Sequence, residues 1–164
     1  MENYICINGK KAELTEEQMK ALGIELPKAN PLHRAEFHNV YYAIDTGGVV
    51  RKCVEKNDGV DNVFYNIANY CTDKETMEQR ALHETLNRLL LRYSMEHDGD
   101  KINWNNTSAC KWYIYYDLRC NNWNYDKMFH SLDFGVFFYS NAIANNAIKE
   151  IIEPFMKAHP EFKW

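Results

Sequence analysis

Length, composition and charge set the first limits on this chain. At 164 residues it suits one domain, or one domain with a small appendage. Its net charge of −4 argues against a surface made for phosphate backbones, because such proteins usually carry a strongly basic face. No apolar run approaches the roughly 18 residues of a membrane span, so we expect no membrane-spanning helix.

The cysteines and the start of the chain indicate a reducing cytoplasm. Five cysteines are scattered, odd in number and nowhere spaced Cys-x-x-Cys, which is typical of free thiols. The first residues lack the apolar stretch of a secretory signal peptide. We therefore expect a cytoplasmic protein without disulfides.

Residues 1–30 read as a small N-terminal ββα unit. A strand over Tyr4–Ile7, a turn at Asn8-Gly9 and a returning strand over Lys11–Leu14 form its predicted hairpin. Thr15 and Gln18 have the spacing of a capping box, so a short helix is expected to follow. A linker over 31–39 then separates this unit from an α+β domain over 40–164.

The first half of that domain, residues 40–98, begins with strands and ends with the longest helix. Strands over Tyr41–Asp45 and Val49–Glu55 flank a glycine-rich turn. The aromatic stretch 63–70 fits either a strand or a short helix. Thr72 and Glu75 have capping-box spacing at the start of a helix over 73–96. Its apolar positions predict one buried stripe of Met77, Ala81, Leu82, Leu86, Leu89, Leu90 and Tyr93.

The second half, residues 109–164, follows a similar order. Aromatic strands are expected over Lys111–Arg119 and Trp123–Phe129, and a third strand over Phe134–Tyr139. Ser140 or Asn141 then caps a terminal helix. The chain thus predicts an α+β fold of antiparallel sheets with amphipathic helices on one face. A tandem ββ(β)α repeat lies beside the N-terminal unit in this interpretation.

One face of the long helix carries candidate binding residues. Arg80, Arg88 and Arg92 recur there at intervals of four or eight residues, and three guanidinium groups can follow phosphates or an acidic partner surface. Glu84 lies four residues from both Arg80 and Arg88, which equally favours a solvated face of ion pairs.

The strand rich in tryptophan and tyrosine carries a second candidate surface. Alternation places Tyr113 and Tyr115 on one face and Trp112 and Tyr116 on the other. If helices cover one face only, the open face is available for stacking bases or holding a protein. We take Trp112, Tyr116 and Trp123 as contact residues, and coverage of both faces is the competing interpretation.

No motif assigns a catalytic centre, a metal site or a cofactor. His83 and Asn87 fall one residue short of the His-Glu-x-x-His pattern, because Asn87 replaces the second imidazole that zinc needs. A metal-dependent enzyme is one alternative, since carboxylates can bind magnesium, although turn chemistry also explains aspartate at strand ends. The aspartates concerned are Asp45, Asp117, Asp126 and Asp133.

Four short motifs occur in order between residues 70 and 140. They are an aromatic-x-Thr-x-Lys-Glu helix start at 70–75, an Ile-Asn-Trp loop at 102–104, a Lys-Trp-Tyr-Ile-Tyr-Tyr-Asp strand at 111–117 and a Phe-Tyr-Ser junction at 138–140. With these motifs the stretch from Tyr41 onward resembles small accessory proteins encoded by phages and prophages of gut Firmicutes. The shared elements are caps, turns and strand aromatics, so the resemblance speaks to lineage and fold.

The resemblance also implies a class of function. Phage accessory proteins of this size are often anti-defence factors, including anti-CRISPR inhibitors of the RNA-guided nuclease of type II systems. It therefore implies a non-enzymatic protein of the host bacterial cytoplasm that binds this nuclease, its nucleic acid or both. The mild charge of −4 sets the chain apart from a strongly acidic DNA mimic. A DNA-binding or regulatory module that uses the arginine face of the long helix is the other alternative.

Overall fold

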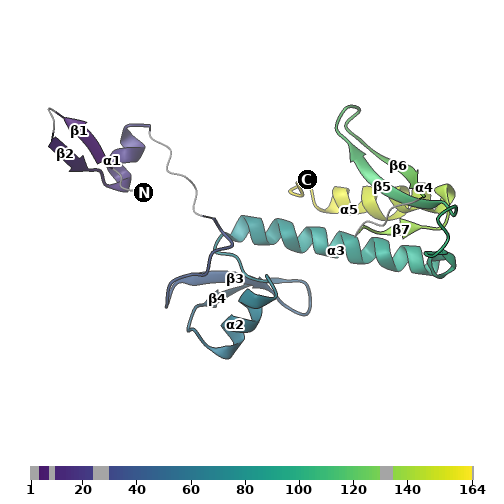
Figure 1. Cartoon of the computed structure of the whole chain (residues 1–164), viewed down its shortest axis with the longest axis horizontal. Helices are drawn as coiled ribbons and strands as arrows, with labels where there is room; N and C mark the ends of the chain where they lie inside the picture. The colour runs from purple at the N-terminus through teal and green to yellow at the C-terminus, as the bar shows by residue number, and fades with distance from the viewer. Residues whose placement is uncertain (1–3, 8–9, 24–29, 130–134, 164) are drawn as a thin grey trace.

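The computed structural model describes residues 4–7, 10–23, 30–129 and 135–163 (Figure 1). Its helices and its antiparallel strands confirm the predicted α+β class. None of the helices in these ranges is long and apolar enough to cross a membrane.

The N-terminal unit has the predicted elements: β1 (Tyr4–Ile7), β2 (Lys10–Glu13) and α1 (Glu16–Ala21). β1 and β2 pair antiparallel, and the predicted turn at Asn8-Gly9 lies outside the described residues. The capping box before α1 is confirmed. Thr15 N–H donates to Gln18 Oε1 at 2.9 Å, and Gln18 N–H donates to Thr15 Oγ1 at 3.3 Å.

The first half of the larger region consists of β3 (Val40–Ile44), β4 (Val50–Val54), α2 (Gly59–Asn66) and α3 (Lys74–Glu96). The stretch 63–70, which fitted either a strand or a helix, forms the end of α2 and the turn after it. Asp58 is the N-cap of α2 and explains why this helix begins at Gly59. Its side chain accepts from the N–H groups of Val60 and Asp61, and the Asp61 carboxylate accepts in turn from the Asp58 N–H.

The cap of α3 lies one residue later than predicted. Asp73 Oδ1 accepts from the Thr76 N–H at 2.8 Å, so Asp73 is the N-cap and the capping box at Thr72 was wrong. Thr72 instead donates its hydroxyl to the Pro31 carbonyl at 3.1 Å. The predicted apolar stripe is confirmed: Met77, Ala81, Leu86 and Tyr93 are buried, and its three other leucines are half-buried.

A short 3₁₀ turn, η1 (Gly99–Lys101), follows α3. The second half then begins with β5 (Lys111–Asp117), β6 (Asn122–Met128) and β7 (Phe137–Phe138). These strands form one antiparallel sheet in the order β6-β5-β7. The third strand is shorter than predicted, and its expected start at Phe134 lies outside the described residues.

The C-terminal helical segment comprises α4 (Asn141–Ala147), a π-helical turn, η2 (Ile148–Ile152), and α5 (Glu153–Ala158). Of the two cap candidates, Ser140 is the cap, because its hydroxyl accepts from the Ile143 N–H at 3.3 Å. The π turn lies just before Pro154, whose missing N–H removes one helical hydrogen bond.

The two halves share a strand connectivity. In the first, β3 pairs with β4 on one side and, through Tyr42, with Cys71 on the other. In the second, β5 pairs with β6 on one side and, through Trp112, with Phe138 on the other. Each third segment reaches the cap of its helix two residues later. The second half therefore has the predicted ββ(β)α order, whereas the first half has the extra helix α2 after β4 and a single bridge in place of the third strand.

Candidate binding site

An open groove of about 360 Å³ lies between α3 and the β5–β6 hairpin. We call it the α3 groove. His83, Glu84 and Asn87 line its helix side, and Tyr115, Tyr116 and Trp123 line its strand side. The groove thus joins two features that the sequence placed far apart, the charged face of the long helix and the aromatic strands.

Two of the three predicted aromatic contact residues meet in this groove. Tyr116 and Trp123 are cross-strand partners whose rings lie edge to face, with centroids 5.3 Å apart. The Tyr116 hydroxyl donates to Asn121 Oδ1 at 2.7 Å, which holds the tyrosine ring in place. Trp123 is half-buried and packs against the core cluster that contains Leu86 and Ile152. The hydrogen bond of Tyr116 and the packing of Trp123 therefore fix the strand side of the groove.

Trp112, the third predicted aromatic, does not line the groove. It is half-buried, packs against the cluster of Tyr93 and Phe138, and meets Tyr125 edge to face at 5.9 Å. The helices thus cover the face of the sheet that carries Trp112. Alternation places Tyr113 on the opposite face, outside both of these core clusters.

Two of the three arginines of α3 pair with one carboxylate. Arg80 Nε lies 3.1 Å from one oxygen of Glu84, and an Arg88 nitrogen lies 3.0 Å from the other. Arg80 also donates to the carbonyl of Ala68, in the turn that follows α2. Arg92 is exposed further along the helix. Of these side chains only Glu84 lines the α3 groove, and none of the three predicted arginines does. In the ion-paired trio one carboxylate offsets one of two guanidinium charges.

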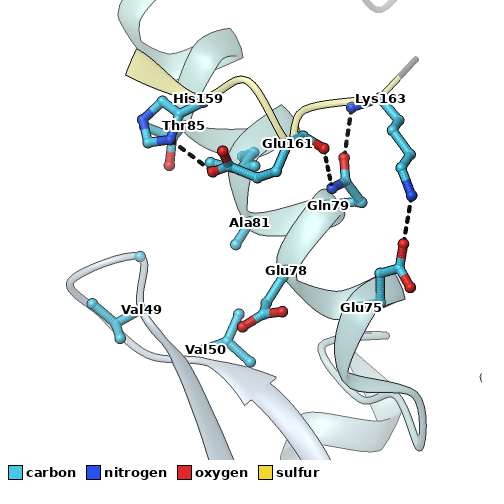
Figure 2. Close-up of a pocket in the computed structure, with 12 residues that line it drawn as sticks. Val49, Val50, Glu75, Glu78, Gln79, Ala81, Thr85, His159, Glu161 and Lys163 are labelled. Atoms are coloured by element: carbon cyan, nitrogen blue, oxygen red, sulfur yellow. Dashed lines mark hydrogen bonds and ion pairs between the residues drawn. The ribbon is translucent and has the colours of Figure 1, made fainter. Parts of the chain in front are cut away.

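A larger cavity of about 690 Å³ lies between the β3–β4 turn, α3 and residues 159–163, and we call it the tail pocket (Figure 2). The Gln79 side chain donates to the Glu161 carbonyl at 2.9 Å and accepts from the Lys163 N–H at 2.8 Å. Lys163 Nζ also lies 2.5 Å from a Glu75 oxygen. Sequence reasoning missed this pocket, because it depends on residues 159–163 folding back onto a helix about 80 residues earlier in the chain.

A buried polar network holds the β3–β4 hairpin to its surroundings. Glu55, which is 0% exposed, accepts from Arg34 Nε at 3.1 Å and from the Tyr70 hydroxyl at 2.8 Å. Asp61 accepts from the Tyr41 hydroxyl at 2.7 Å. The bonds from Arg34 hold the pKa of Glu55 below its usual value, and burial raises the pKa of Tyr70 to about 12. Because each of these groups is paired with another within the chain, we interpret the network as stabilising the fold and not as a binding site.

The strand-end aspartates form local turns. Asp45 Oδ1 accepts from the N–H groups of Gly47 and Val49, both at 2.9 Å. Bonds from Arg119 lower the pKa of Asp117 to about 2. Asp133 lies outside the described residues. In the ranges that are described, no group of three or more His, Cys, Asp and Glu side chains is placed to hold a metal ion.

Comparison of the chain with protein-family models, with curated proteins and with solved structures finds no significant match.

Proposed function

We propose that this chain is a non-enzymatic phage or prophage protein that acts by binding, and that its target is the RNA-guided nuclease of a type II CRISPR system. The observation that supports binding is the α3 groove, which Tyr116 and Trp123 line together with Glu84 of the helix. Tyrosine, tryptophan and arginine are the side chains most enriched at the energetic centres of protein interfaces. The choice of target rests on the resemblance of the stretch from Tyr41 onward to phage accessory proteins.

Protein is a better match for this groove than a bare phosphate backbone. Glu84 occupies the space between Arg80 and Arg88 and offsets part of their charge. A phosphate approaching them would also meet that carboxylate and a chain of net charge −4. A partner surface with an apolar centre and mixed charges at its edge can use the rings and the ion pairs together.

Co-purification with a guide-loaded type II nuclease, combined with a target-cleavage assay, tests the proposal. We expect the chain to be retained by the nuclease and to protect target DNA. The variant Asn87→Trp fills the α3 groove from an exposed helix position, whereas Asn146→Trp makes the same change on an exposed position of α4. The first should lose at least about tenfold in affinity, which corresponds to about 1.4 kcal/mol, and the second should bind normally.

Two results would remove the proposal. One is a chain that neither binds the nuclease nor protects its target. The other is binding to naked duplex DNA with a steep salt dependence that disappears when Arg80, Arg88 and Arg92 become glutamine, because this result assigns the arginine face to DNA.

A further inference from the structure

The outer edge of β3 is closed by hydrogen bonds. The Asn69 side chain accepts from the Ile44 N–H at 2.8 Å and donates to the Ile44 carbonyl at 2.7 Å. Two residues away, Tyr42 and Cys71 exchange backbone hydrogen bonds of 2.7 and 3.0 Å. The groups that β3 turns away from β4 at Tyr42 and Ile44 are therefore already paired.

The outer edge of β6 is closed in a different way. Asn122, Asn124 and Asp126 alternate along this strand, and the side-chain oxygen of each accepts from the N–H of the next residue, at 2.9, 2.9 and 2.7 Å. These bonds occupy donors that an edge strand otherwise offers to another chain.

The edge of β4 is open by comparison. Asp45 N–H donates to Val49 and Glu55 N–H donates to Asn39, both at 2.9 Å, and these bonds set the alternation of the ladder. Within the strand, the backbone groups of Val50, Lys52 and Val54 consequently point away from β3. In the part of the chain that the structure describes, no backbone or side-chain group is hydrogen-bonded to them from that side.

We propose that β4 is a strand-addition site that binds an extended segment of a partner protein, with an acidic residue between two aliphatic residues. An added strand gains main-chain hydrogen bonds from the open edge, and its alternate side chains set the specificity. Val50, Lys52 and Val54 lie on one face of β4. Residues placed opposite them on a new strand pair best as aliphatic, acidic and aliphatic.

Charge on this edge argues against a second copy as the occupant. An antiparallel pairing of two β4 strands in full register places Lys52 directly opposite its counterpart in the second copy. Like charges directly opposite each other destabilise a strand pair, and an exposed lysine is a common means of keeping edges apart. The same exposed ammonium group favours a partner strand with a carboxylate at that position.

This site goes beyond the proposed function and does not depend on it. The α3 groove lies between α3 and the second hairpin, whereas the open edge belongs to the first hairpin. A peptide probe reports on β4 alone, so a failure at β4 leaves the nuclease proposal standing, and the reverse also holds.

The test uses the full chain labelled with ¹⁵N and two capped heptapeptides, Thr-Val-Thr-Glu-Thr-Val-Thr and the same peptide with lysine at its centre. We expect the glutamate peptide to shift the amide signals of Val50, Lys52 and Val54 and to slow their hydrogen exchange. The lysine peptide should bind about threefold to tenfold more weakly, and the variant Lys52→Glu should reverse this preference.

A backbone variant provides the second arm. Lys52→Pro removes an outward N–H that the β3–β4 ladder does not use, so the hairpin should remain while both peptides lose affinity. Three results overturn the proposal: amide shifts that fall outside β4, a peptide preference that Lys52→Glu leaves unchanged, or concentration-dependent β4 shifts without peptide, which identify a second copy as the occupant.

Discussion

The two halves of the larger region share a strand connectivity but have different interiors. The first half has apolar clusters that include Tyr41 and Ile44, and its hairpin is also held by buried charges, with Glu55 0% and Asp61 4% exposed. The hairpin of the second half packs against apolar side chains of β7 and η2, among them Phe138 at 1% and Ile152 at 0% exposure. The same order of strands and helix is therefore compatible with apolar packing plus directional hydrogen bonds to buried carboxylates in one case, and with mainly apolar packing in the other.

This difference predicts different sensitivities. Hydrogen bonds and ion pairs depend on charge state, so the first half should respond to pH and to isosteric changes of charge. Apolar packing depends on volume, so the second half should respond to truncation. The following experiments, from the largest expected effect to the smallest, separate the two.

Truncating the apolar core should produce the largest loss. Phe138→Ala removes a ring that is 1% exposed and should lower the free energy of unfolding by about 3–5 kcal/mol. Urea unfolding followed by circular dichroism measures this loss. Phe138→Leu, which retains most of the volume, should cost clearly less. Equal losses in the two variants would contradict a packing origin.

Removing one buried charge should cost somewhat less. Glu55→Gln keeps the shape of the side chain but weakens its bonds to Arg34 and Tyr70, and should lower the free energy of unfolding by about 2–3 kcal/mol. Arg34 is partly exposed, which limits the loss because water can solvate its guanidinium group. Glu78→Gln, which alters an exposed ion pair with Lys74, should change stability by less than about 1 kcal/mol. Similar effects of the two variants would contradict a special role for the network.

The network should also make stability depend on pH at both extremes. Bonds from Arg34 lower the pKa of Glu55 from its usual 4.5, so its contribution is present above that value and is lost as pH falls through the lowered pKa. The pKa of Tyr70 is raised from 10.0 to about 12, so its contribution is present below pH 10 and is lost as pH rises toward 12. Melting temperatures measured from pH 2 to 6 should fall less steeply toward acid for Glu55→Gln than for the natural chain. Parallel curves would refute this assignment.

The helix caps should give the smallest effect and the closest match between the halves. Asp73→Ala and Ser140→Ala each remove an N-cap bond and should cost about 1 kcal/mol of unfolding free energy. Thr72→Ala should cost less than Asp73→Ala, because the Thr72 hydroxyl bonds to the Pro31 carbonyl rather than to α3. Urea midpoints in the opposite order would restore Thr72 as the cap.

Local patterns predicted the elements well, because their determinants lie within a few residues of one another. The capping box of Thr15 and Gln18 and the apolar stripe of α3 are of this kind. The cap of α3 was misplaced by one residue, since Thr72 and Asp73 are both good N-caps and a distant carbonyl decides between them. The contact between Arg34 and Glu55 spans 21 residues and has no periodic signal.

The candidate site was only half predictable for the same reason. Strand alternation separated Trp112 and Tyr116 from Tyr113, but it could not show which face the helices cover. Tyr116 and Trp123 were identified from their chemistry, whereas His83 and Asn87 became groove residues only when α3 and the second hairpin came together. The open edge of β4 was not foreseen either, because an unpaired strand edge is known only once every pairing is known.

The return of residues 159–163 to α3 has a consequence for synthesis. The backbone of Glu161 and Lys163 meets Gln79 across 82 and 84 residues, whereas the contacts of Glu55 and Asp61 span at most 21. A nascent chain can therefore complete its polar hairpin before the C-terminal residues are made that cover one face of α3. During translation this face, with Leu82 and Leu86, is the surface that a ribosome-associated chaperone would meet first.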